Sequence, residues 1–70
     1  MSSAVQSVLI SRKHHTLRDA TKKLLDMGFI KKKLDITDNW YRFRQIDPSE
    51  FKRFRIKRIA PDVMLVIGFH

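Results

Sequence analysis

The clearest pattern in the sequence is an amphipathic helix bounded by a start signal and a stop signal. Residues 16–28 carry apolar side chains at the i, i+3, i+7 and i+10 positions of one helical face: Leu17, Ala20, Leu24 and Met27. Thr16 is a favourable N-cap, and Asp19 stands three residues later, as in a capping box. Gly28 occupies the position where helices commonly end in a left-handed residue, and Phe29 would then pack back on the helix.

Alternating and apolar runs predict strands on both sides of this helix. The strand candidates are residues 4–10, 30–36, 40–46, 54–59 and 63–69, of which 30–36 is the weakest. Turn residues occupy 37–39 and 60–62, and Asp47-Pro48 predicts a helical turn or a tight loop. With one middle strand in question, the order is β-α-β-β-β. We expect a two-layer α+β fold in which one helix packs on a mainly antiparallel sheet of three to five strands.

The composition describes one small basic domain over residues 1–70. The chain has no cysteine, so packing has to stabilise it without disulfides, and self-association into a homo-oligomer stays open. The longest apolar stretch, residues 63–69, is far shorter than the roughly 20 residues of a membrane-spanning helix. No secretory signal is visible at the amino terminus. We therefore expect a soluble, intracellular protein that is not secreted and does not act at a membrane.

Catalytic and metal-binding chemistry finds little support in the sequence. His14 and His15 lie among lysines and arginines, whose positive field discourages cation binding, and no ligand spacing accompanies them. Ser11, His14 and Asp19 are the residue types of a catalytic triad, but no nucleophile elbow contains them. No glycine-rich phosphate loop is present either. We expect a protein that is not an enzyme and uses no cofactor or metal.

Positive charge dominates the surface chemistry that the sequence predicts. The formal net charge is +8, and residues 31–58 hold ten of the fifteen Lys and Arg but four of the seven acids. Such a balance favours a polyanionic partner, which is DNA, RNA or an anionic membrane surface, and of these we expect nucleic acid. The plainer interpretation is that the excess cations keep a small domain soluble.

Strand periodicity predicts where these cations lie, because side chains alternate between the two faces of a sheet. The simplest arrangement buries four apolar residues beneath the helix: Tyr41, Phe43, Phe54 and Ile56. Four cations then share the open face: Arg42, Arg44, Arg55 and Lys57. Trp40 flanks them.

Such a face has the chemistry of a nucleic-acid-binding surface. Guanidinium groups bind phosphates in a bidentate manner, and Trp40 could stack on an unpaired base. Lys32 and Lys33 are further candidates, although cations just after a helix also favour its dipole. The alternative is an ordinary amphipathic sheet with polar residues outward and Trp40 packed at an edge.

Three segments together resemble a small, largely uncharacterised domain of large DNA viruses and tailed phages. They are AVQSVLISRKHHTLRDATKKLLDMGF, DNWYRFRQIDPSEF and FRIKRIAPDVMLVIGF, which cover nearly the whole chain. That domain occurs alone or attached to head-assembly proteins such as prohead proteases. Two positions depart from its usual pattern: His15 stands where an aromatic residue is common, and Asp62 where glycine is common. The resemblance implies a viral or mobile-element origin, and it implies no catalytic residue.

Two functions are compatible with these observations. The first is a non-enzymatic viral or phage accessory protein that binds nucleic acid non-specifically through the basic sheet face. The second is a virion, assembly or host-protein interaction module without nucleic-acid binding, in which charge steers the encounter or a sheet edge pairs with a partner. Either would act in the cytoplasm or nucleus of an infected host, or be packaged in the virion.

Overall fold

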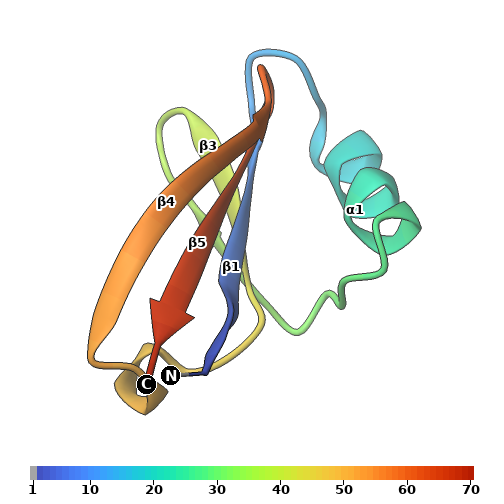
Figure 1. The fold of residues 1–70 in the computed structure, drawn as a ribbon. Coiled ribbons are helices and arrows are strands. Elements are labelled where there is room, and N and C mark those ends of the chain that lie inside the picture. The colour runs from blue at the N-terminus through green and yellow to red at the C-terminus, as the bar shows by residue number, and fades with distance from the viewer. Residues whose placement is uncertain (1) are drawn as a thin grey trace.

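The protein is described from a computed structural model that covers residues 2–70, and Figure 1 shows one helix beside one twisted sheet. The elements in chain order are β1 (Ser3–Ser11), α1 (Leu17–Asp26), β2 (Lys33–Ile36), β3 (Trp40–Arg44), the 3-10 turn η1 (Pro48–Glu50), β4 (Arg53–Ala60) and β5 (Val63–Phe69). The predicted fold class, a two-layer α+β domain, is confirmed. Four strands follow the helix where the predicted order has three, because the weakly patterned segment at 33–36 also joins the sheet.

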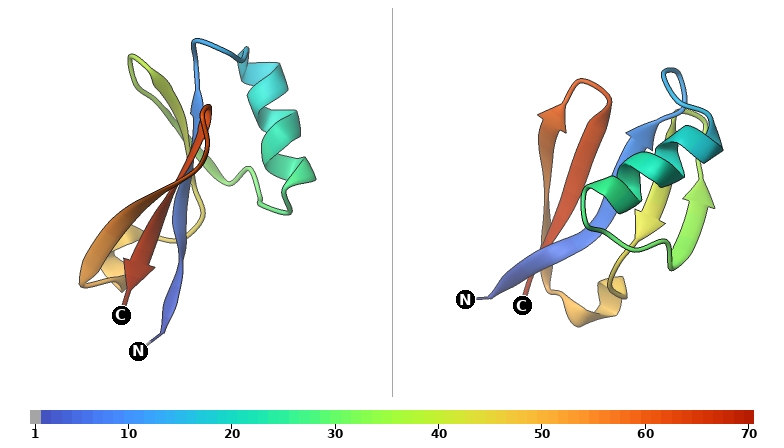
Figure 2. Two further views of the ribbon diagram at one scale, coloured as in Figure 1. Left: turned by 45° about the horizontal axis from the view of Figure 1, so that its top comes forward. Right: turned by 90° about the vertical axis from the view of Figure 1, so that its right-hand side faces the viewer.

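All strand pairs are antiparallel, in the order β2-β3-β1-β5-β4. The first strand is therefore central, whereas β2 and β4 form the two edges. A bulge interrupts the β1–β5 pairing between Val5 and Ser7. In Figure 2 the helix lies in front of β1 and β3, and the β4–β5 hairpin lies beside it. The edge strand β4 is consequently not covered by the helix.

Local sequence signals set both ends of the helix as predicted. The Asp19 amide donates to Thr16 Oγ1 over 3.2 Å, which caps the amino end. At the other end Gly28 has a φ of 88°, a conformation that favours glycine. The Phe29 amide donates to the Leu24 carbonyl and the Gly28 amide to the Leu25 carbonyl, which together form a Schellman motif. Local sequence therefore sets where the helix begins and ends.

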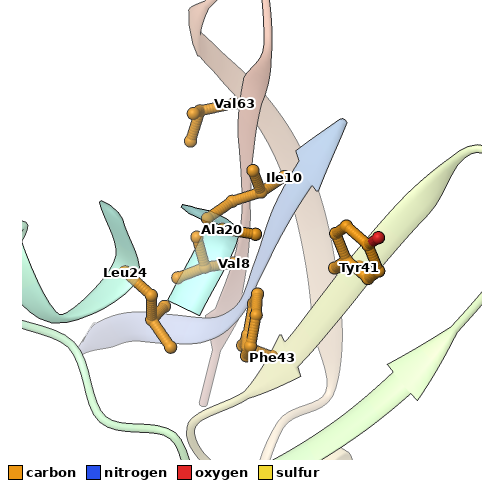
Figure 3. Packing of buried hydrophobic residues seen from close by; sticks show 7 residues of the cluster. All are labelled: Val8, Ile10, Ala20, Leu24, Tyr41, Phe43 and Val63. Carbon is orange, nitrogen blue, oxygen red and sulfur yellow. The ribbon is translucent and has the colours of Figure 1, made fainter. Parts of the chain in front are cut away.

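The core lies between α1 and the helix-facing side of β1, β3 and β5 (Figure 3). Its buried members are Val8, Ile10, Ala20, Leu24, Tyr41, Phe43 and Val63. Leu17 and Met27 pack against this cluster from the helix, so the predicted helical stripe is confirmed. The predicted burial of Tyr41 and Phe43 is confirmed too, with exposed fractions of 9% and 0%.

Candidate nucleic-acid interface

The pairing register decides which cations share a face, since cross-strand partners in an antiparallel sheet project to the same side. One row of partners across the sheet runs Arg42, Leu9, Met64 and Arg58. A second row runs Arg44, Ser7, Val66 and Ile56. Both rows lie on the face opposite the helix. We call this side, with Trp40, the open face.

The intervening rows lie on the helix side of the sheet. One of them runs Phe43, Val8, Leu65 and Lys57, and Arg55 pairs with Ile67 on the same side. The prediction that Arg42, Arg44, Arg55 and Lys57 share one open face is therefore wrong. Phe54 and Ile56 are also not beneath the helix. They lie on the open face, with 47% and 63% of their surface exposed.

The reason for this error is the position of β4 at the edge of the sheet. Every residue from Arg53 to Ile59 is exposed, so burial does not favour one orientation of the strand over the other. Its orientation follows instead from pairing with β5 and from a register shift between Arg58 and Ala60. Alternation shows which residues share a face of such a strand, but it does not show which face is covered.

Arg42 is held within the protein by a buried polar network. Its Nε donates to Ser7 Oγ over 3.3 Å and its Nη2 donates to Gln6 Oε1 over 3.2 Å. The Ser7 hydroxyl also donates to Gln6 Oε1, and the Gln6 side chain donates to the carbonyl of Ile46. Gln6 and Ser7 are completely buried beside the β1 bulge. The guanidinium of Arg42 therefore donates to two buried side-chain oxygens, and its role is structural.

Arg44 also has a partner within the sheet. Its Nη2 lies 3.1 Å from Asp35 Oδ2 on β2, and its buried Nε has no hydrogen-bond acceptor within residues 2–70. Arg44, Lys32 and Lys33 line one small hollow of about 140 Å³ that Asp47 shares. The pKa of Asp47 is lowered, first by hydrogen bonds from Ser49 and less strongly by the charges of Arg44 and Lys33. Carboxylates thus offset the positive charge at this site.

Trp40 lies on the open face at the first position of β3, where it pairs with Ser11 at the end of β1. It is half-buried. Its amide donates to Thr37 Oγ1 over 3.1 Å, and its carbonyl accepts from the Thr37 amide over 2.9 Å. These bonds close the turn between β2 and β3 and fix the backbone that carries the indole ring.

The largest group of available cations lies on and just before β4. We call Lys52, Arg53, Arg55, Lys57 and Arg58 the β4 cations. All five are exposed, and the ion pairs within residues 2–70 use only His15, Lys23 and Arg44 as cations. Three of them, Lys52, Arg53 and Arg58, were not among the sequence candidates. The signal was present as the run KRFRIKR at 52–58, which contains five cations and no acid.

A second charged cluster connects the loop after β1 to the turn between β4 and β5. The carboxylate of Asp62 contacts His15 Nε2 and lies 3.4 Å from Lys23 Nζ. The hydrogen bond from His15, helped by the charge of Lys23, lowers the pKa of Asp62 below its usual 3.8. Because the folded state binds that proton less readily than the unfolded state, the pair stabilises the fold above about pH 4 and loses its effect as the pH falls.

The Asp62→Asn variant should therefore show a flatter acid response than the wild type. Urea unfolding followed by circular dichroism at pH 6, 4 and 3 would measure it, with Asp26→Asn as a control at an exposed acid that forms no ion pair within residues 2–70. The wild-type midpoint should fall further between pH 6 and pH 3 than that of Asp62→Asn. An equal fall in both proteins would contradict a stabilising role for this pair.

Comparisons with protein-family models, curated proteins and solved structures found no match to this chain. Within residues 2–70, no group of three or more His, Asp or Glu side chains lies close enough together to hold a metal ion. The single helix of that part of the chain is too short to cross a membrane. Function must therefore be argued from the surface itself.

Proposed function

We propose that this is a non-enzymatic viral or phage accessory protein that binds nucleic acid largely without sequence specificity. The surface that carries the proposal is the set of β4 cations, which are exposed and free of acidic partners within residues 2–70. This replaces a flat basic face that includes Arg42 and Arg44, because both of those side chains already have protein partners. The viral assignment rests on the sequence resemblance alone.

The spacing of the β4 cations supports contacts with a phosphate backbone. Arg53, Arg55 and Lys57 project from one side of an extended strand, so neighbouring side chains are about 7 Å apart. Successive phosphates of a nucleic-acid strand have a similar separation. Arginine adds bidentate hydrogen bonds to the charge attraction. An edge strand also leaves these side chains free to approach a long polymer from one side.

The salt dependence of binding follows from the number of phosphates that are neutralised. Each contact contributes about −0.7 to the slope of log K against log salt for a single strand and about −0.9 for duplex DNA. Three to five contacts therefore predict that binding to a single strand weakens roughly 20- to 130-fold between 50 and 200 mM salt. Such binding carries little sequence information, because the contacts are to phosphate.

The test compares two triple variants that remove the same charge from different places. Arg53→Ala/Arg55→Ala/Lys57→Ala changes the β4 cations, and Arg18→Ala/Lys22→Ala/Lys31→Ala changes exposed cations along α1 and just after it. Fluorescence anisotropy with labelled DNA and RNA at several salt concentrations should show the slope reduced by about two to three for the β4 variant. The control should retain most of the wild-type slope.

Two results would contradict the proposal in different ways. Equal weakening by the two triple variants would mean that total charge, and not β4, attracts the polymer. Absence of wild-type binding at micromolar protein in 50 mM salt would remove nucleic-acid binding as the function. Circular dichroism should show that both variants remain folded, because all six substituted side chains are exposed and lie outside the core.

A second candidate function, a virion, assembly or host-protein interaction module, is favoured by one specific observation. The open face contains an apolar groove of about 410 Å³ that Leu9, Phe54, Ile56 and Val66 line. Exposed apolar surface of this kind is typical of protein interaction sites. The other lining residues are apolar and Arg42 is engaged by Gln6 and Ser7, so the partner that fits is an apolar segment. This candidate replaces the first if the wild type binds no nucleic acid.

A further inference from the structure

A second pocket on the open face lies where three segments meet at one end of the sheet. Lys13, His14, Asn39, Trp40, Arg58 and Pro61 line it, and its volume is about 290 Å³. The three segments are the loop after β1, the turn between β2 and β3 together with the start of β3, and the end of β4 with its turn into β5. Resting on the nucleic-acid-binding function above, we propose that this pocket holds one unpaired base of a single strand, stacked on Trp40, with the neighbouring phosphate at Lys13 and Arg58.

The backbone around this pocket is held together by hydrogen bonds among the three segments. The Arg12 amide donates to the Asn39 carbonyl over 2.9 Å, and the Ser11 amide donates to the Asp62 carbonyl over 2.9 Å. Trp40 is itself paired with Ser11 across β1 and β3. The pocket is therefore formed without a ligand, which lowers the entropy cost of binding.

The lining combines the two chemistries that a nucleotide requires. The indole ring of Trp40 offers a π-face, and any base can stack on it. Lys13 and Arg58 are exposed cations without an acidic partner in residues 2–70, and Asn39 adds an amide that can donate and accept. No carboxylate lines the pocket. The nearby carboxylate of Asp62 is already engaged by His15 and Lys23.

The position of Arg58 connects this pocket to the proposed backbone-binding strand. Arg58 belongs to the β4 cations and also lines the pocket. From Arg53 to Arg58 the strand extends about 17 Å, or a few nucleotides. Arg53, Arg55 and Lys57 project to the helix side of the sheet, whereas Arg58 projects to the open face. A single strand bound along β4 would therefore pass around this uncovered edge of the sheet to reach the pocket. A duplex keeps its bases stacked inside and cannot place one on Trp40. The pocket therefore predicts a preference for single strands over duplexes of the same sequence.

Trp40 is the only tryptophan of the chain, so its fluorescence reports on this pocket directly. A single-stranded 12-mer should quench the emission to saturation, and adenosine monophosphate at high concentration should quench it as well. Ribose 5-phosphate, which lacks a base, should not. Trp40→Leu should weaken single-strand binding about 5- to 150-fold, the range for loss of one stacked base, and change duplex affinity less than twofold. Trp40→Phe should restore most of the single-strand affinity.

A second variant keeps the test valid if Trp40→Leu does not fold. Lys13→Ala/Arg58→Ala retains the fluorophore and should reduce quenching by the 12-mer more than the charge-matched Arg18→Ala/Lys31→Ala. If the 12-mer and the duplex bind with the predicted salt dependence but neither quenches Trp40, this inference is wrong and the proposed function stands. If neither binds by anisotropy, the proposed function itself is wrong. Equal quenching of Trp40 by the 12-mer and by the duplex would also overturn the proposal of a base-stacking site.

Discussion

Phe43→Ala is expected to lower the free energy of unfolding by about 3–5 kcal/mol, the usual cost of removing a fully buried phenylalanine. Phe43 has no exposed surface and lies between β1 and β2 on the helix-facing side of the sheet. A domain of this size has a total stability of roughly 4–10 kcal/mol. The variant should therefore be close to its unfolding midpoint or past it at 25 °C. Urea or thermal unfolding followed by circular dichroism measures this directly.

Phe54→Ala is the matched control, because it removes the same side chain from the open face. Phe54 is 47% exposed, and its ring meets the Phe51 ring edge to face at 6.0 Å. Its loss should cost about 1–2 kcal/mol, since half of the apolar area is already in water and one aromatic contact disappears. A Phe54→Ala cost equal to that of Phe43→Ala would mean that the core extends to the open face. That result would contradict the two-layer description.

Most of the fold could be predicted from the sequence because its signals are local or strongly periodic. Thr16 and Gly28 mark the helix through backbone hydrogen bonds that form within a few residues. Asp47 likewise caps η1 by accepting from the Ser49 amide. The strands other than β2 have sequences that alternate or are continuously apolar. β2 has only four residues and a weak pattern, and it joins the sheet by pairing with β3.

The candidate site was predictable only in part because its geometry depends on long-range register. The predicted faces of β3 were correct, since Tyr41 and Phe43 pack into the core. The predicted faces of β4 were wrong, because neither side of this edge strand is covered and its apolar side, with Phe54 and Ile56, has no core to enter. The bulge that buries Gln6 gave no sequence signal either, and Gln6 is what engages Arg42. Charge density showed that a basic surface exists, whereas the register decides where it is.

One side-chain contact joins two loops that are far apart in the sequence. The His15 ring contacts the carboxylate of Asp62. This contact connects the loop before α1 to the β4–β5 turn. Both residues lie next to segments that line the Trp40 pocket. His14 and Pro61, which line that pocket, are each adjacent in sequence to one member of this contact.

Gly68→Ala is expected to destabilise the protein by about 2–4 kcal/mol, although alanine is otherwise better than glycine in a strand. Gly68 is buried on β5, and a Cβ there would lie within 3.0 Å of the Phe51 ring. The ring, only 8% exposed, would have to leave its place. Phe51 follows η1, and the neighbouring Lys52 amide donates to the Phe69 carbonyl over 2.9 Å, so this contact also positions the start of β4.

A double-mutant cycle tests whether the Phe51 ring is the cause. Phe51→Ala alone should cost about 3 kcal/mol through lost burial. Once the ring is gone the added methyl group has room, so Phe51→Ala/Gly68→Ala should be no less stable than Phe51→Ala by itself. The coupling energy should then be at least 2 kcal/mol, well above the few tenths seen for independent sites. Additive costs would show that Gly68 is required for another reason, such as the path of the β5 backbone. In that case the Phe51 ring would not be the reason that glycine occupies position 68.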